Sequence, residues 1–504
     1  MISLFRSVFP RQIFLGCLLL LLAVVVPAFS QTAQPTPSAT SITATVTPAA
    51  TPATVEAAPV VERDHKGTLA QKGQSLLGLL TLTALCFGIG QLRRPRLKPL
   101  LRTVVWGLAL QFVFAVLVLN TPGFFGAINS AVDGLLGFSR EGGKFLFGNL
   151  VDNNVPVGLP LGSKAMGPIP SPTAYANVGA YFAFSVLPTI IFFSALSTLM
   201  YFLGILQPIV RGLSWVMQGT MGTSGSETLS GVANIFLGQT EAPLFVRPFI
   251  AKATKSELMA IMTGGFSNIA SGVLAAYVSM LSGFEPQIAG HLLSASIISA
   301  PASLVVAKLL VPESEVSETM GNTPLHVEKE DANVIDSAAR GAIEGLQLAL
   351  NVGAMLLVFV ALVAMLNALL GWIGLKAGMP DLSLQLLLGW LLAPVAWLIG
   401  VPWEECSKVG ALIGVKTVIN EFVAYLQLAT EMGKDGNYLN ARSFIIAAYA
   451  LCGFANFSSI AIQIGGIGSM APERRHDLSK LGMISMIGGG IASCMTACVV
   501  GILL

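Results

Sequence analysis

Two glutamates lie inside apolar segments, where a charged side chain is rare. Glu241 stands between the apolar runs 235–237 and 244–245, and Glu421 is flanked by apolar pairs on both sides. By membrane-insertion scales, a charge at the centre of a bilayer costs roughly 2.5 to 3.5 kcal/mol, so ionisable groups there generally serve a function. The alternative is a carboxylate in a loop at the membrane surface. We expect both glutamates to be buried at a polar site within a membrane protein.

Amides and hydroxyls accompany each glutamate in the sequence. In the first half of the chain they are Gln239 and Thr240, and in the second half Asn420, Asn456, Ser458 and Ser459. Such side chains form hydrogen bonds with hydroxyl and amide groups, which indicates a neutral polar ligand. An anionic ligand would require arginine or lysine there, and we expect no embedded cation.

Two further amides, Asn234 and Asn268, lie in or just after the first of these segments. With backbone carbonyls freed where helices break, they would supply oxygen ligands for a hard cation such as Na⁺. Hydrogen bonds between helices would explain the two asparagines equally well. The residues alone leave both interpretations open.

The composition is that of a membrane protein. Of the 504 residues, 54% are hydrophobic and only 11% charged, whereas soluble domains carry about 25% charged residues. The net charge of +2 gives no basic field for binding nucleic acid. The cysteines and histidines form no cluster at metal-site spacing, so we expect packing roles for the cysteines, no cofactor and no enzymatic activity.

The N-terminal region is typical of a targeting segment. Residues 1–30 contain two arginines, an apolar run at 13–26 and a small-residue end, the pattern of a cleaved signal peptide. An uncleaved anchor is the alternative. Residues 31–63 are rich in Thr, Pro and Ala and predict a disordered tail, which a cleaved leader would place outside the cytoplasm.

Further apolar segments follow at 73–92, 100–121, 178–205, 256–282, 286–311, 345–373, 383–400, 443–468 and 481–504. If all but 383–400 cross the membrane, the loops rich in Arg and Lys fall on one side, which the positive-inside rule makes cytoplasmic. We therefore expect about eight transmembrane helices in the cell membrane, with an external N-terminus and an external C-terminus.

Two segments are interrupted in a way that a continuous span does not allow. Residues 220–250 are broken at 238–243, and residues 402–430 at 420–422. Broken helices occur in a bilayer only where protein or a water-lined cavity covers them, which predicts two re-entrant hairpins. Three crossings separate the hairpins, so they would enter from opposite faces as an inverted repeat with a central binding site.

The predicted fold class is an all-α polytopic membrane protein with two re-entrant helical hairpins in an inverted repeat, suited to alternating access. The expected domains are a leader (1–30), a disordered external tail (31–70), N-terminal spans with an amphipathic connector (71–175), a first repeat half (176–312), an acidic, solvated cytoplasmic linker (313–342) and a second repeat half (343–504).

Three stretches resemble the signatures of the concentrative nucleoside transporter family. They are GQTEAPL at 238–244, TVINEF at 417–422 and CGFANFSSI at 452–460, in the order of the family. The likeness extends from about residue 75 to the C-terminus. It implies Na⁺- or H⁺-coupled uptake of nucleosides by a homotrimer, with a scaffold domain and a mobile transport domain in each protomer that move as an elevator.

The resemblance also implies roles for individual residues, carried over by position. The nucleobase would be bound by Gln239, Thr240 and Glu241, with Val273 packing against it. The ribose would be held by Glu421, Asn456 and Ser459, with Phe454 lining the pocket. Sodium would be held by the side chains of Asn234 and Asn268 and the carbonyls of Leu237 and Ile269. At residue 268 the family usually has a small hydroxyl residue, so the identity of the ion stays open.

Other functions fit the same pattern less fully. The nearest is a carrier for another neutral polar solute on this fold, followed by a proton-coupled nucleoside transporter. A channel would need a continuous polar lining, yet the polar residues are confined to the centre of the segments. An enzyme using Glu241 and Glu421 as acid and base lacks a nucleophile or cofactor loop. Purine or pyrimidine preference is not readable from the sequence.

Overall fold

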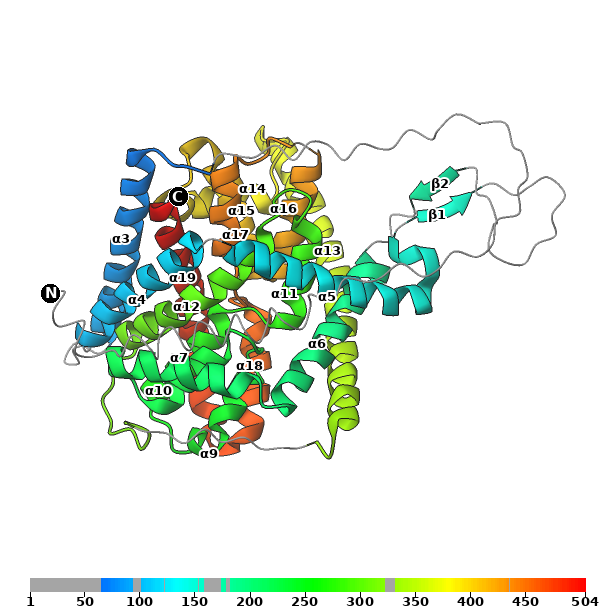
Figure 1. Ribbon diagram of the computed structural model, residues 1–504. Coiled ribbons are helices and arrows are strands. Elements are labelled where there is room, and N and C mark those ends of the chain that lie inside the picture. Colours follow the sequence, from blue (N-terminus) through cyan, green and yellow to red (C-terminus); the bar gives the residue numbers. More distant parts are fainter. Residues whose placement is uncertain are drawn as a thin grey trace. The chain divides into compact units, whose positions relative to one another are not determined.

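The computed structural model describes residues 65–93, 101–121, 123–152, 154–157, 174–177, 182–321, 331–434 and 436–504. The predicted leader and nearly all of the predicted tail lie outside these residues. Gly67–Leu504 form one compact unit, whose elements are labelled in Figure 1.

The described residues of the N-terminal part of this unit form three α-helices, a 3₁₀ turn and a short β-ribbon. Helices α3 (Leu69–Arg93) and α4 (Leu101–Asn120) agree with the first two predicted spans. After them come α5 (Phe124–Phe147), the 3₁₀ turn η2 (Gly148–Asp152), and strands β1 (Asn154–Val157) and β2 (Ala174–Asn177). The strands pair antiparallel, Asn154 opposite Asn177, and are the one departure from the all-α prediction in the described ranges.

The next elements form the first repeat half. They are η3 (Phe182–Val186), α6 (Leu187–Phe202), α7 (Leu206–Met221), α8 (Gly225–Ala233), η4 (Ala242–Val246), α9 (Arg247–Ile250), α10 (Lys255–Ser267), α11 (Ser271–Leu281) and α12 (Ile288–Leu310). A capping box of Ser224 and Glu227 begins α8, since each side chain bonds the backbone N–H of the other. Glu227 therefore caps the N-terminal end of the first limb of the hairpin.

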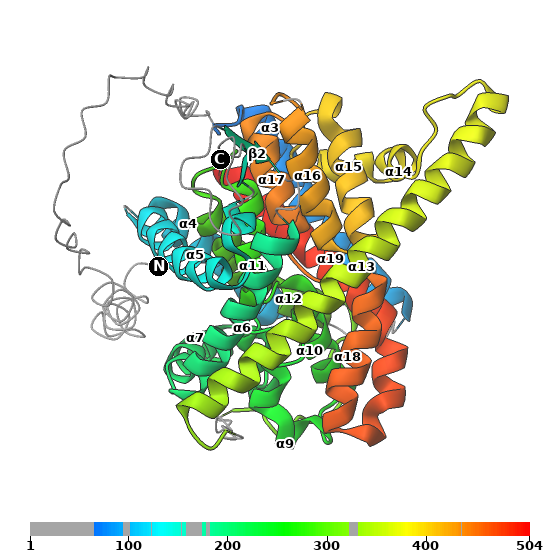
Figure 2. The ribbon, with the colours of Figure 1, turned by 90° about the vertical axis from the view of Figure 1, so that its right-hand side faces the viewer.

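The second half has its elements in the same order as the first: a long helix, a second helix, a broken hairpin, a span broken near its middle and an unbroken span. Its elements are α13 (Val334–Ala377), α14 (Leu384–Leu398), α15 (Trp403–Val418), α16 (Glu421–Lys434), α17 (Ala441–Leu451), α18 (Phe457–Met470), η5 (Pro472–Arg474) and α19 (Arg475–Leu503). In Figures 1 and 2 the first hairpin, with α9, enters from one end of the unit, and the second, with α15 and α16, from the opposite end.

The number of spans agrees with the prediction. Among the described residues, seven helices are long and apolar enough to cross a membrane, and the predicted span at 443–468 is divided into the shorter apolar helices α17 and α18. The run at 383–400 does not continue through, because α14 and α15 meet at a bend of 114°.

Helix α13 differs most from its predicted extent. It begins at Val334 and has 44 residues, which at 1.5 Å per residue is about 66 Å, twice the thickness of a hydrocarbon core. The helix therefore runs obliquely, as Figure 2 shows. Hydropathy marked only its central part, because its first turns carry charged residues such as Asp336 and Arg340.

The expected solvated linker is in part buried. Ser317 and Thr319 are only 6% and 5% exposed, and both donate hydrogen bonds to the Glu257 carboxylate at the start of α10. Lys308, at the end of α12, pairs with Glu227 at 2.6 Å and with Glu313 at 3.3 Å. This network fixes the linker's first residues against the base of the first hairpin, so the prediction of a solvated connector is wrong for them.

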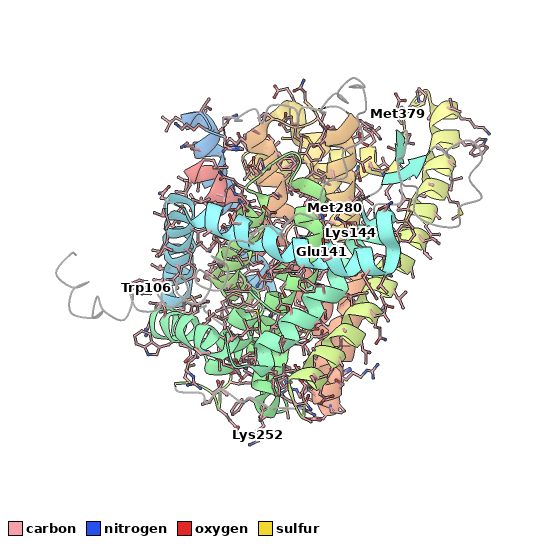
Figure 3. All side chains as sticks on the ribbon, turned by 45° about the vertical axis from the view of Figure 1, so that its right-hand side comes forward. Trp106, Glu141, Lys144, Lys252, Met280 and Met379 are labelled. Carbon is pink, nitrogen blue, oxygen red and sulfur yellow. The ribbon has the colours of Figure 1, made fainter. Side chains whose placement is uncertain are left out.

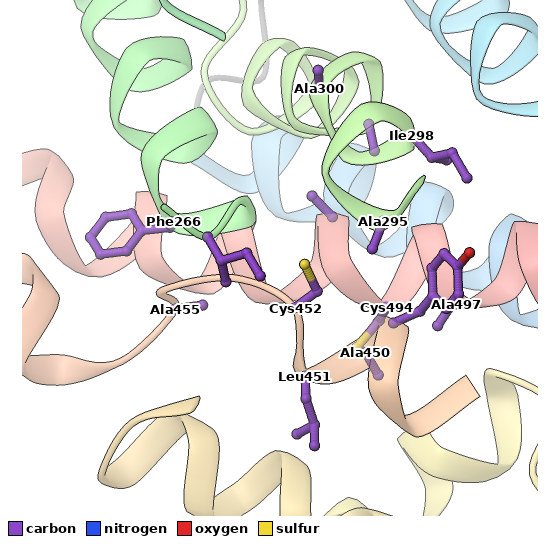
Figure 4. Packing of buried hydrophobic residues seen from close by; sticks show 14 of the residues in the cluster. Phe266, Ala295, Ile298, Ala300, Ala450, Leu451, Cys452, Ala455, Cys494 and Ala497 are labelled. Atoms are coloured by element: carbon purple, nitrogen blue, oxygen red, sulfur yellow. The ribbon is translucent and has the colours of Figure 1, made fainter. Parts of the chain in front are cut away.

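The interior contrasts with an apolar exterior. Of the most apolar 18-residue stretch of each helix, 89% is buried in α12 but only 11% in α13. Large side chains such as Trp106 on α4 point outwards (Figure 3). Inside, the small residues Ala295 of α12, Ala450 of α17 and Cys494 of α19 lie near Cys452 (Figure 4), and small side chains permit the close approach of membrane helices. The five cysteines in the described ranges are free and buried, as the predicted packing role requires.

Candidate substrate and cation site

The breaks in the two broken spans touch one another. Gly453, between α17 and α18, has a φ of +129°, and a Cβ there would lie 2.7 Å from the carbonyl oxygen of Phe266 and 2.9 Å from the backbone of Ser267. Only glycine adopts this conformation at so short a distance. The end of α10 is thereby held against the second break, where Figure 4 shows Phe266 near Ala455.

The tip of the first hairpin presents Glu241. Thr240 Oγ1 donates to its carboxylate at 3.0 Å, and the carboxylate folds back over Gly238, where a Cβ would lie 2.1 Å from Glu241 Oε2. Glu241 is exposed to a cavity of about 170 Å³ between this tip, α6 and α13. Ser194, Ser197 and other hydroxyl residues of α6 line it, so an entering solute meets a polar wall.

The charges of α13 that face this cavity compensate each other. Arg340 is paired with Asp331 at 2.6 Å and with Glu344 at 3.1 Å. The hydrogen bonds from Arg340 hold the pKa of Asp331 below its ordinary value. The Asp331 carboxylate therefore stays ionised well below neutral pH, and the guanidinium is already committed to carboxylates.

Gln239 connects the first hairpin to α18. Its amide donates to Ser459 Oγ at 3.4 Å and accepts from Gln463 Nε2 at 3.0 Å. Gln463 also donates to the carbonyl oxygen of Met262 on α10. A Cβ at Gly265 would lie 2.6 Å from Gln463 Nε2, so a larger residue there would displace the Gln463 amide from this bridge. Sequence reasoning missed Gln463, although an amide in the apolar run of α18 was a usable signal.

Glu421 lies in a closed environment instead. It is 5% exposed, Tyr277 Oη donates to Oε1 at 3.0 Å, and Asn456 Nδ2 donates to Oε2 at 3.0 Å. Asn456 also caps α18, because its Oδ1 accepts from the N–H of Ser459 at 2.9 Å. Both predicted carboxylates thus lie at hairpin tips, but only Glu241 opens to the cavity. Tyr277 was not predicted, since a tyrosine in an apolar span resembles a packing residue.

These contacts form one network between the two hairpins. It runs from Gln239 through Ser459 and Asn456 to Glu421 and Tyr277. The first turn of α18 therefore joins a tip that enters from one end of the unit to a tip that enters from the other. Of the two residues expected to contact the solute, Val273 is part of the apolar core and 3% exposed, and Phe454 packs against that core. Neither is among the residues that line the cavity at Glu241.

The four predicted cation ligands lie at two helix ends. Asn234 follows the last residue of α8, with Leu237 three residues on, and Asn268 follows the last residue of α10, next to Ile269. A Cβ at Gly264 would lie 3.5 Å from Asn234 Nδ2, which places the two helix ends together. The C-terminal ends of helices carry partial negative charge and favour a cation.

The Asn268 side chain fits a ligand role. Ser299 donates to its Oδ1, while Nδ2 is buried without a hydrogen-bond partner among the described residues. Rotating the amide by 180° would let Ser299 accept from Nδ2 and would turn Oδ1 into the position that lacks a partner. An amide oxygen there is suited to Na⁺. Ser299, on α12, was not predicted.

One prediction about this region is wrong. Lys416, near the end of α15, is an embedded cation and is 2% exposed. Its Nζ donates to the carbonyl oxygen of Ala450 at 3.0 Å and to Ser493 Oγ at 3.3 Å. The ammonium therefore points towards α17 and α19 and not into the cavity at Glu241. The prediction of a neutral ligand is unaffected, because Lys416 does not face that cavity.

Two re-entrant hairpins from opposite ends, two broken spans that cross at their breaks, and a polar network between the tips define a secondary transporter. Comparison with known proteins gives the particular family. Residues 77–150, 183–284 and 291–501 match the family models for the N-terminus of Na⁺-dependent nucleoside transporters, nucleoside recognition (Gate) and the C-terminus of Na⁺-dependent nucleoside transporters. The chain belongs to the concentrative nucleoside transporter family, as its motifs predicted.

Relatives and solved structures agree with this assignment. Sodium/nucleoside cotransporter 1 of Mus musculus is 39% identical over 80% of this chain and 60% of its own length, so the chain spans about three fifths of that relative. An uncharacterised transporter of Haemophilus influenzae is 41% identical over 85% of this chain and 97% of its own. The structure of CNTnw in an inward-facing substrate-bound state matches with a TM-score of 0.74 and 39% identity, covering 86% of this chain and 97% of that one. An outward-facing CNTnw variant matches with a TM-score of 0.76 and 38% identity, over 86% and 98%.

Proposed function

We propose that this protein is a Na⁺-coupled nucleoside symporter of the cell membrane that works by alternating access. The observation that carries the proposal is the first hairpin, where the cation ligands Asn234 and Leu237 immediately precede Gln239, Thr240 and Glu241. A cation that orders the end of α8 also fixes the residues that face the solute. Sharing one short segment couples the two binding events.

The site residues then divide between the two parts of a nucleoside. Glu241 meets the base in the open cavity, and Gln239 and Thr240, directly before it in the chain, complete the contact, with Val273 as an apolar neighbour. Asn456, Ser459 and Glu421 hold the ribose hydroxyls, with Phe454 at the edge. Each oxygen of Glu421 already accepts one hydrogen bond, from Tyr277 or from Asn456, and keeps a second lone pair to which a ribose hydroxyl would donate.

The position of Glu241 between two groups of helices indicates which parts of the protein move during transport. Its cavity is bounded on one side by the hairpin tip and on the other by α6 and α13. We assign α6 and α13, with the N-terminal spans, to a scaffold, and the hairpins and broken spans to a transport domain that slides as an elevator. A homotrimer with external termini completes the proposal, and light scattering in detergent and cysteine accessibility near the C-terminus would test these two points.

The coupling ion is tested by uptake of labelled uridine into proteoliposomes. An inward Na⁺ gradient at equal pH should drive accumulation, and replacing Na⁺ with choline should remove it. Unlabelled nucleosides should compete, whereas free sugars should not. Uptake that ignores Na⁺ and follows an inward proton gradient would favour the proton-coupled alternative, and failure of nucleosides to compete would refute the substrate.

The cation ligands are tested at Asn268. Asn268→Leu keeps the size and removes the oxygen, so the Na⁺ concentration for half-maximal uptake should rise about tenfold, equivalent to roughly 1.4 kcal/mol. Asn268→Ser restores an oxygen and should recover much of the affinity. Ser303→Ala is the matched control, because Ser303 is a buried hydroxyl one turn from Ser299 whose hydrogen bond goes to the carbonyl oxygen of Ala300. An unchanged Na⁺ dependence in Asn268→Leu would remove Asn268 from the site.

A further inference from the structure

The buried lysine Lys416 has no role in the transport mechanism proposed above. Its Nζ reaches the carbonyl oxygen of Ala450 at 3.0 Å, in the last turn of α17, where a carbonyl has no partner within the helix. Its second partner, Ser493 Oγ, donates in turn to the carbonyl oxygen of Cys452 just beyond that end. The ammonium is thus bound by oxygens at the C-terminal end of a helix.

Its charge is held without a direct ion pair. In the described part of the chain no carboxylate accepts a hydrogen bond from Lys416, although the Glu421 carboxylate attracts it across the break in the hairpin. Burying an ammonium costs several kcal/mol unless the site is strongly favourable. Here α15 and α17 both end beside it, at Val418 and Leu451, and the negative ends of their dipoles supply the compensation.

The first half of the chain has the same arrangement without a lysine. The elements of the two halves correspond in order. Helices α8 and α15 are each the first limb of a hairpin, and α10 and α17 are each the first part of a broken span. The ends of α8 and α10 converge at Asn234 and Asn268, where one amide nitrogen has no partner. The ends of α15 and α17 converge on Lys416 Nζ.

We propose that the ammonium group of Lys416 occupies, in the second half, the position that the coupling Na⁺ occupies in the first half. The second hairpin is therefore held permanently against α17 and α19, whereas the first is ordered only when Na⁺ binds. Na⁺ would then control Glu241 and Gln239 but leave Glu421 in place. The inference rests on the proposed cation site and adds an asymmetry to it.

Amide hydrogen exchange on the intact wild-type protein tests the asymmetry. When Na⁺ is replaced by choline, residues 234–241 should lose protection, while residues 414–420 keep it. Equal loss at both tips would overturn the role of Lys416. A first tip that ignores Na⁺ would instead refute the proposed cation site, so the two failures are distinguishable.

Substitution tests the charge itself. Lys416→Met keeps the length and removes the charge, and uridine uptake should fall at least about tenfold, as expected for losing charge-assisted hydrogen bonds. In Lys416→Ala, added n-propylammonium should restore part of the uptake, and neutral 1-propanol should not. Lys408→Met is the matched control, because Lys408 lies on the same helix and bonds a backbone carbonyl, that of Tyr438, at 2.8 Å, but is only half-buried. Uptake by Lys416→Met equal to that of wild type would overturn the proposal.

Discussion

Glu241→Gln should raise the uridine concentration for half-maximal uptake by roughly 10- to 150-fold. A hydrogen bond to a charged partner contributes about 1.5 to 3 kcal/mol, and each 1.4 kcal/mol is a factor of ten. Glu241 is the carboxylate that opens to the cavity at the hairpin tip, so its contribution goes mainly to the solute. Concentration-dependent uptake in proteoliposomes under a fixed Na⁺ gradient measures the effect.

The matched control for this change is Glu344→Gln. Glu344 lines the same cavity but belongs to α13 and is engaged by Arg340 at 3.1 Å. Its replacement removes an equal charge from the same space and should change affinity by less than about threefold, the range of an exposed ion pair. If both variants lose affinity equally, the cavity needs negative charge in general, and the specific role of Glu241 is refuted.

Glu421→Ala is the second change with a large expected effect, and it should abolish measurable uptake. It leaves two buried donors, Tyr277 Oη and Asn456 Nδ2, without the acceptors that they bond at 3.0 Å. Each such group costs about 1 to 3 kcal/mol. Because Asn456 also caps α18, loss of its partner should disturb the network that joins the hairpins. Uridine uptake and thermal unfolding of the purified protein measure the two consequences.

Tyr277→Phe separates support of Glu421 from contact with the solute. It removes a single donor and keeps the ring, so uptake should fall less than in Glu421→Ala while the protein stays folded. Glu431→Gln is the control on the same helix, since Glu431 forms a surface pair with Lys434 at 2.8 Å and should not matter for transport. Normal uptake by Glu421→Ala would exclude Glu421 from the substrate site.

The sequence predicted the path of the chain through the membrane well. Apolar runs marked the spans, and the polar interruptions at 238–243 and 420–422 marked both hairpin tips, because these signals are local in the chain. The extent of α13 was missed, since its first turns are amphipathic and give no apolar run. The buried residues Ser317 and Thr319 of the linker were missed for a similar reason, because polar residues buried by hydrogen bonds look like solvated ones in a sequence.

The two glutamates show what the sequence by itself determined. Their types, apolar neighbours and motifs identified a membrane transporter family and placed polar groups at its centre, because the high cost of a membrane-embedded charge makes even one residue informative. Their different surroundings were not readable. Glu241 and Glu421 lie in similar local patterns, yet one opens to a cavity and the other is enclosed by Tyr277 and Asn456.

Only the tertiary structure decided which residues complete the site. Tyr277 meets Glu421 across 144 positions, Gln463 meets Gln239 across 224, and Lys416 reaches Ser493 across 77. An isolated tyrosine, glutamine or lysine in an apolar run carries no local mark of its partner, because that partner is brought to it by helix packing alone. The sequence therefore determined that the chain has a polar centre in the membrane, and the packing of the broken helices decided how its charges are divided.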